Sequence, residues 1–398
     1  MSYGPSLDWL NFLLADVRGG LGPYVSVYLL TEANWDQATI GAVLTASGLV
    51  GITLHTPMGM IIDATRSKRA LIVAGVAALS VCALAIAWRP SVPVVLAADI
   101  VMAALGGLFA PTVAAITLGL SGPGELAARI GRNVAFDRLG NLAVAALAAA
   151  VGTAVSLTAV FYLVPFFAVL TTVAILSIPA SAIDHERARG LDSKAAAERP
   201  GPPAGWFKLL TYRPFLLLAA VTILFHFANA PMLALASQKL ALSHPGREAA
   251  LTSSAIIVAQ LATIPMALLV GQADILGRKP LLVLAFLALP ARGLLFSYAD
   301  GAAWIIAGQV LDGIGSGLFD TLLPLVLSDI MRGSGRYNAS RGIIGTIQGV
   351  GGSSSHVFAG AMVVGVGYGW AFMALAGIAA CALVLVVLAM PETKPKDA

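Results

Sequence analysis

Four polar residues interrupt a long apolar stretch in the last third of the chain and share a helical spacing. They are Gln309, Asp312, Ser316 and Asp320. This spacing places all four side chains along one stripe of a helix. We expect Asp312 or Asp320 to carry a proton and Gln309, Asp312 and Ser316 to contact a polar solute, because these groups hydrogen-bond and the carboxylates titrate. The alternative is that the stripe only forms hydrogen bonds between helices.

A second polar stripe lies in an earlier apolar stretch, where Thr222, His226, Asn229 and Ser237 share one helical face. His226 and Asn229 are candidate solute ligands, and the imidazole is a candidate proton carrier because it titrates near neutral pH. Pro231 would free a backbone carbonyl one turn earlier, which adds an acceptor to the same face. The alternative is a histidine that serves only in packing.

The first apolar stretch contains a carboxylate and a guanidinium two residues apart. Side chains at this spacing point about 200° away from each other, so Asp16 and Arg18 need different partners. We expect Asp16 to be a further proton-coupling residue and Arg18 to contact solute. A fixed ion pair with a neighbouring helix is the alternative for each. Weaker candidates within apolar stretches are His55, Gln260, Arg292 and Gln348.

The composition indicates which solvent surrounds these groups. Hydrophobic residues make up 58% of the 398-residue chain, charged residues only 11%, and the mean hydropathy is +0.88. A soluble domain carries about a quarter charged residues, which excludes an ordinary cytosolic enzyme. The chain also has no P-loop, no HExxH sequence and no Cys/His zinc spacing, and its two cysteines lie in apolar runs. We therefore expect no enzymatic activity, no cofactor and no bound metal.

The apolar stretches predict the fold. With about 20 residues needed for each crossing, the chain accommodates about twelve transmembrane helices. They are predicted at about 7–30, 38–62, 70–88, 93–118, 134–157, 160–180, 213–237, 250–271, 280–298, 303–328, 342–366 and 369–390. The prediction is an all-α membrane protein with an N-terminal six-helix bundle over 1–182, a cytoplasmic linker over 183–212 and a C-terminal six-helix bundle over 213–398.

The basic residues predict orientation and partners. Most of the 24 Lys and Arg residues follow even-numbered spans or lie in the central linker. Because cytoplasmic loops are enriched in these residues, we expect a protein of the cell's inner (plasma) membrane with both termini on the cytoplasmic side. Because these cations are scattered over short loops, no nucleic-acid partner is expected. The expected partners are a small-molecule solute, protons and the lipid bilayer, and the protein is expected to be a monomer.

Two turns carry a family resemblance. The run from Gly59 to Arg69 and the run from Asp274 to Lys279 are similar to the G-x-x-x-D-R-x-G-R-R/K signature of the major facilitator superfamily. The two halves also share a Gly-Leu-Phe sequence, at 107–109 and 317–319. The first signature departs from the family pattern at Ala64, Arg66 and Ser67, and the second has Val270 in place of Gly.

The resemblance implies two pseudo-symmetric bundles that rock around a central site near the bilayer midplane, lined by the first, fourth, seventh and tenth spans. It also implies that Asp63 docks near the start of the eleventh span, at Arg341 and Gly342. An aspartate at the C-terminal end of its own helix gains from such a partner. The expected gating residues are Asp63, Lys68, Arg69, Asp274, Arg278 and Arg341.

Together these features predict secondary active transport of a small polar or amphipathic organic solute by alternating access, coupled to protons. An exporter and an uptake permease are not separated by sequence. The alternatives are an uncoupled permease, a transition-metal carrier using His226 with Asp320, and a non-transporting receptor or assembly partner.

Overall fold

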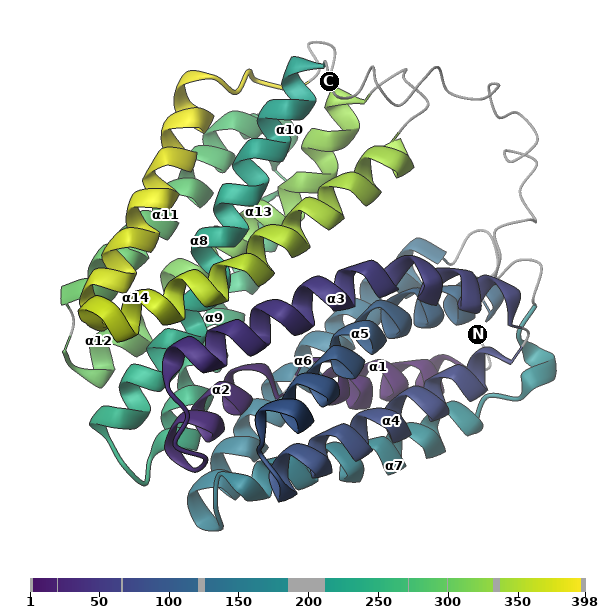
Figure 1. Ribbon diagram of the computed structural model, residues 1–398. Coiled ribbons are helices and arrows are strands. Elements are labelled where there is room, and N and C mark those ends of the chain that lie inside the picture. Colours follow the sequence, from purple (N-terminus) through teal and green to yellow (C-terminus); the bar gives the residue numbers. More distant parts are fainter. Residues whose placement is uncertain are drawn as a thin grey trace. The chain divides into compact units, whose positions relative to one another are not determined.

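The computed structural model describes residues 3–19, 21–65, 67–120, 126–184, 212–270, 272–298, 300–331 and 337–394, and the regular elements in this part of the chain are all helices (Figure 1). The chain divides into two compact units. The N-terminal unit comprises Met1–Ala33, Ala46–Arg199 and Gly246–Ser253. The C-terminal unit comprises Asn34–Thr45, Pro200–Pro245 and Ser254–Ala398.

The helices of the first half of the chain are α1 (Gly4–Gly19), α2 (Gly22–Thr31), α3 (Gln37–Ala64), α4 (Lys68–Trp88), α5 (Val92–Leu120), α6 (Leu126–Ala154), η1 (Thr158–Tyr162), α7 (Leu163–Leu176) and η2 (Ala180–Ala182). In this half α1 packs against α6 and α7, and α4 packs against α5 and α7. The first crossing is split into α1 and α2, and α2 begins with Pro23 in its first turn, where a missing N–H costs nothing.

The helices of the second half are α8 (Arg213–Ser243), α9 (Glu248–Val270), α10 (Ala273–Leu276), α11 (Arg278–Tyr298), α12 (Ala302–Ala307), α13 (Gln309–Ile330) and α14 (Tyr337–Leu388). Three buried rings, Phe225, Phe286 and Phe319, join α8, α11 and α13, with centroids 4.5 to 5.0 Å apart. This aromatic contact fixes the helices that carry the polar stripes.

The predicted all-α fold with twelve crossings is confirmed. Ten helical segments in the described part are long and apolar enough to cross a membrane. A further crossing is the pair α1 and α2, each too short alone. The last belongs to α14, in which Gly367 has a non-helical backbone (φ 87°) that divides the long helix into two spans. Large apolar side chains point outward, as in Trp88 (92% exposed) and Leu268 (73% exposed), which suits a lipid surface.

Helix α6 begins earlier than predicted, at Leu126 and not at about 134. The added residues include arginines and Asn133, which apolarity alone assigns to a loop. They are helical because their polar side chains have partners on α1 and α5, described below.

Candidate functional site

A buried arginine is the centre of a polar network in the C-terminal unit. Arg292 of α11 is fully buried. Its Nη1 donates to Asn229 Oδ1 of α8 and to Asp312 Oδ1 of α13, both at 2.8 Å. Its Nη2 donates to Gln309 Oε1 at 2.6 Å. One guanidinium therefore ties three helices together and is neutralised by one carboxylate, the arrangement that a charge in an apolar interior requires.

The network continues towards side chains that are partly accessible. Asn229 Nδ2 donates to Ser316 Oγ at 3.1 Å, and Ser316 Oγ donates to Asp312 Oδ1 at 3.3 Å. The Asp312 side chain is 16% exposed, whereas Gln309 is fully buried. The structure thus brings the predicted Asn229, Gln309, Asp312 and Ser316 into one cluster, with Gln309 on its sealed side.

His226 lies in a second, smaller cluster on α8. Gln348 Nε2 of α14 donates to His226 Nε2 at 2.8 Å, which makes this ring nitrogen the acceptor and leaves the ring proton on Nδ1. The same Nε2 is 4.0 Å from Asp320 Oδ1 of α13, and the Asp320 side chain is 57% exposed. The imidazole therefore lies between an amide donor and a carboxylate.

The N-terminal unit contains its own charged network. Asp8 of α1 is buried and accepts hydrogen bonds from two arginines of α6. Arg129 Nη2 donates to its Oδ1, and Arg132 Nη2 donates to its Oδ2 at 2.7 Å. Arg129 Nε also donates to Asn133 Oδ1 at 2.8 Å, and Asn133 Nδ2 donates to Thr117 Oγ1 of α5 at 2.9 Å.

Sequence reasoning missed the Asp8 network. Asp8 stands at the edge of the first apolar run, and the positions of Arg129 and Arg132 indicate orientation without indicating a partner. The available signal was the spacing of Arg129, Arg132 and Asn133, which puts a cationic and amide face on one helix. The buried Arg129 needs an anion on a neighbouring helix, and Asp8 supplies it to Arg129 and to the exposed Arg132.

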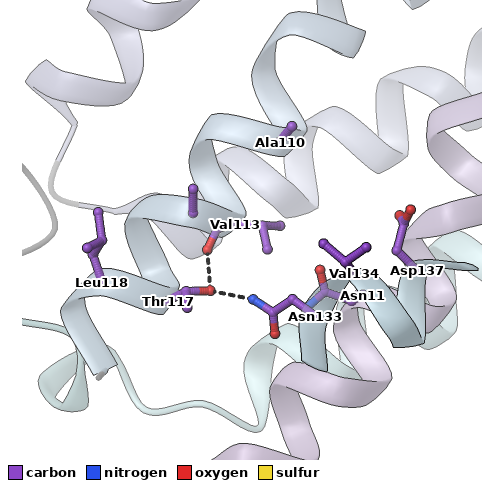
Figure 2. Close-up of a pocket in the computed structure, with 9 residues that line it drawn as sticks. Asn11, Ala110, Val113, Thr117, Leu118, Asn133, Val134 and Asp137 are labelled. Carbon is purple, nitrogen blue, oxygen red and sulfur yellow. Dashed lines mark hydrogen bonds between the residues drawn. The ribbon is translucent and has the colours of Figure 1, made fainter. Parts of the chain in front are cut away.

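A cavity of about 260 Å³ opens beside this network (Figure 2). Its polar lining consists of Asn11 from α1, Thr117 from α5, and Asn133 and Asp137 from α6. Alanine, valine and leucine side chains of α5 and α6 form the rest of its wall. Figure 2 shows the Thr117–Asn133 hydrogen bond at the cavity surface, with Asp137 on the α6 side. Such an amphipathic lining suits a small solute with both polar and apolar parts.

Four predicted residues, Asp16, Arg18, Asp63 and Asp274, have side chains outside the described part of the chain. Two gating candidates in the first signature can be placed. Lys68 is 1% exposed, and its Nζ donates to the Ile62 and Thr65 carbonyls at 3.0 and 3.4 Å. Arg69 Nη1 donates to the Ile178 carbonyl at 2.6 Å. Both cations satisfy carbonyls at or just beyond helix C-terminal ends, where positive charge is favourable.

In the second signature, Arg278 Nε donates to Asp329 Oδ2 of α13 at 3.1 Å, and both side chains are buried. The Arg278 and Lys279 amides at the start of α11 donate to the Glu392 carboxylate at 2.9 and 3.0 Å. Arg341 is exposed, and its predicted contact with Asp63 lies outside the described part. The turn therefore fastens α11 to α13 and to the segment after α14.

Comparisons with known proteins identify the family. The profile described as Major Facilitator Superfamily matches residues 9–289 and 248–398. An uncharacterized MFS-type transporter of Mycobacterium tuberculosis is 42% identical over 394 residues in both the CDC 1551 / Oshkosh and the ATCC 25618 / H37Rv strains. The alignment covers 98% of this chain and 94% of that protein.

Solved structures share the fold at low sequence identity. The nucleoside transporter NupG is 15% identical, with a TM-score of 0.76 over 97% of this chain and 98% of that chain. The xylose transporter XylE from E. coli, in a partially occluded inward-open conformation, is 14% identical, with a TM-score of 0.70 over the whole of both chains. These likenesses concern the backbone fold alone.

Proposed function

Since this chain belongs to the major facilitator superfamily of membrane transporters, we propose that it is a proton-coupled secondary transporter of a small polar or amphipathic organic solute, working by alternating access. The observation that carries this proposal is the presence, in each unit, of a buried arginine neutralised by a carboxylate and linked to uncharged amides and hydroxyls. Such groups recognise a solute by hydrogen bonding in an apolar surrounding.

The charges of the Arg292 network favour a neutral or cationic solute over an anionic one. Arg292 is fully buried and occupied by Asp312, Asn229 and Gln309. Arg129 is likewise held by Asp8 and Asn133. The accessible polar groups of the Arg292 network are an amide, a hydroxyl and a carboxylate, which present acceptors and neutral donors. An anion would meet no uncompensated cation there. In the Asp8 network the Arg132 side chain is 61% exposed and shares the Asp8 carboxylate with Arg129.

Proton coupling is assigned to His226 and the carboxylates near it. The neutral ring accepts from Gln348, and a protonated ring would turn to Asp320, 4.0 Å away. Because Gln348 and Asp320 belong to different helices, taking up a proton changes which helix α8 is bonded to. Proton binding at His226 is thereby linked to a change in helix contacts, and proton-coupled transport requires such a link. Asp312 is the second proton candidate, because a proton on its carboxylate would remove the negative charge that neutralises Arg292.

Solute binding can be tested first. A thermal-shift screen of the purified protein would compare neutral, cationic and anionic solutes of matched size, since a bound compound raises the Tm. We expect neutral or cationic hydrogen-bonding solutes to stabilise the protein. Ser316→Ala and Thr117→Val should each weaken binding about fivefold, for about 1 kcal/mol per lost hydrogen bond. Ser80→Ala is the matched control, because that hydroxyl bonds only to the Val76 carbonyl of its own helix.

Transport is tested with the compound so found. Proteoliposomes should accumulate it under a pH gradient and only equilibrate it without one, and His226→Gln should lose accumulation while retaining exchange. Equilibration of the solute without accumulation under a pH gradient would contradict coupling and leave an uncoupled permease. Tight binding without any flux would favour the receptor alternative. Within the described residues no group of three His, Cys, Asp or Glu side chains could hold a metal ion, so nothing there supports a metal cargo.

A further inference from the structure

One partly buried carboxylate has no part in either network. Asp99 lies in the eighth position of α5, within a membrane-spanning helix. Ser47 Oγ of α3 donates a hydrogen bond to its Oδ2. In the part of the chain that the structure describes, no Lys, Arg or His forms an ion pair with Asp99. An ionised carboxylate without a cation is costly at this depth, whereas the neutral acid is not.

The helices carrying this pair touch one turn further along. A Cβ added to Gly51 of α3 would lie 2.5 Å from the Ala103 Cβ of α5. Gly51 follows Ser47 by four residues in α3, and Ala103 follows Asp99 by four residues in α5. The two helices therefore run side by side in the same direction, and the Gly51–Ala103 contact lies one turn after the Ser47–Asp99 hydrogen bond. The closeness of the backbones leaves no room for a water molecule at the glycine.

The Ser47–Asp99 contact lies close to the point in α3 where the helix passes from one compact unit to the other. Residues Asn34–Thr45 of the α3 region group with the C-terminal unit, and the helix from Ala46 onward groups with the N-terminal unit. Ser47 is therefore in the first turn of α3 that belongs to the N-terminal unit. The hydrogen bond to Asp99 anchors α3 where the helix passes from one unit to the other.

We propose that Asp99 is a further proton-binding group of this transporter, protonated while α3 is packed on α5 and ionised when that contact opens. In the step, the carboxyl O–H bond breaks and the proton passes to a water molecule that enters between the helices, leaving a hydrated carboxylate. The Ser47 hydroxyl faces the group from α3. The buried Cys82 thiol of α4 lies near enough for the Asp99 carboxylate to act on it electrostatically. This inference rests on the proposed proton coupling.

Two variants test it. Asp99→Asn keeps an acceptor for Ser47 but fixes the group as neutral, so we expect solute exchange to persist and accumulation driven by a pH gradient to be lost. Ser47→Ala leaves the acid in place and removes only its partner, so gradient-driven uptake should persist with a shifted pH profile. Asp300→Asn is the control, because its carboxylate is 99% exposed and pairs with Lys239. Wild-type accumulation in Asp99→Asn, or an unchanged pH profile in Ser47→Ala, would overturn the inference.

A second readout separates this inference from the proposed function. Infrared difference spectra of the wild type should contain the carbonyl band of a protonated carboxylic acid, which Asp99→Asn removes and Asp300→Asn keeps. If wild-type uptake proves independent of the pH gradient, proton coupling fails, and with it the role given to Asp99. Loss of the band in Asp99→Asn would still identify Asp99 as a protonated acid. A band that survives in Asp99→Asn would overturn the assignment of the proton to this residue, whatever the flux.

Discussion

Arg292 shows how a single side chain can organise a membrane bundle. A guanidinium in an apolar interior is costly unless its charge is balanced and most of its donors are engaged. Asp312 balances the charge, and the Asn229 and Gln309 carbonyls accept two further bonds. The arginine thus holds Asn229 and Asp312 at the more accessible edge of the network.

Removing this arginine is predicted to destabilise the C-terminal unit. Arg292→Met leaves Asp312 as an uncompensated buried carboxylate, which should cost about 3 to 5 kcal/mol of unfolding free energy. The double variant Arg292→Met with Asp312→Leu should recover most of that loss, because no charge remains to be paired. Chemical unfolding in detergent measures both. The exposed Arg89→Met serves as control, and equal losses in the single and double variants would refute this account of the network.

Glu392 provides a pH-dependent contact outside the membrane spans. Burial acts to raise its pKa, but hydrogen bonds from the backbone amides of Lys394, Lys279 and Arg278 outweigh burial and hold the pKa below its usual value. A carboxyl whose folded pKa is depressed stabilises the folded state above its unfolded pKa of about 4.5 and loses this effect as the pH falls through the folded pKa.

The Glu392 contact should therefore weaken in acid. Hydrogen exchange at the Arg278 and Lys279 amides should be slow at neutral pH in the wild type and faster in Glu392→Gln, for a loss of about 0.5 to 2 kcal/mol, as for other helix-capping side chains. Below the folded pKa the two proteins should exchange alike. A difference that persists unchanged in acid would show that the carboxylate charge has no role.

At the scale of elements, two glycines give a matched test of the second signature turn. Gly277 ends α10 at φ 88°, and a Cβ there would lie 2.8 Å from Glu392 Oε2. Gly246 has φ 82° with nothing within 4 Å of an added Cβ. Gly246→Ala should cost only backbone strain, about 1 to 2 kcal/mol, and Gly277→Ala should cost about 1 kcal/mol more. Thermal unfolding measures the difference, and equal costs would show that the Glu392 contact is not stabilising.

The helices themselves could be predicted from the sequence, because crossing a bilayer demands long apolar runs. The stripe on α13 could also be predicted, since its spacing is a property of one helix. The partners on other helices could not. Nothing in the sequence of α11 indicates which neighbour Arg292 meets, and Asp8 lies too near the edge of an apolar run to stand out. Those contacts depend on which helix faces are packed together, and periodicity alone does not determine that.

At the scale of the whole molecule, each unit contains its own polar network. Both place an arginine against a carboxylate from another helix and connect the pair to asparagine and a hydroxyl, Asn133 with Thr117 in one and Asn229 with Ser316 in the other. The networks are not copies, because their arginines lie on different spans in the two halves.

The central claim, that solute and proton share a cycle, is tested most directly by proton movement. Coupling is reciprocal, so a solute gradient must drive protons just as a pH gradient drives solute. Proteoliposomes in weakly buffered medium, with the charge compensated by valinomycin and potassium, would receive the solute identified by thermal shift while the external pH is recorded. The account predicts a pH change that needs both protein and solute and disappears in His226→Gln. Solute flux with no accompanying pH change would contradict it.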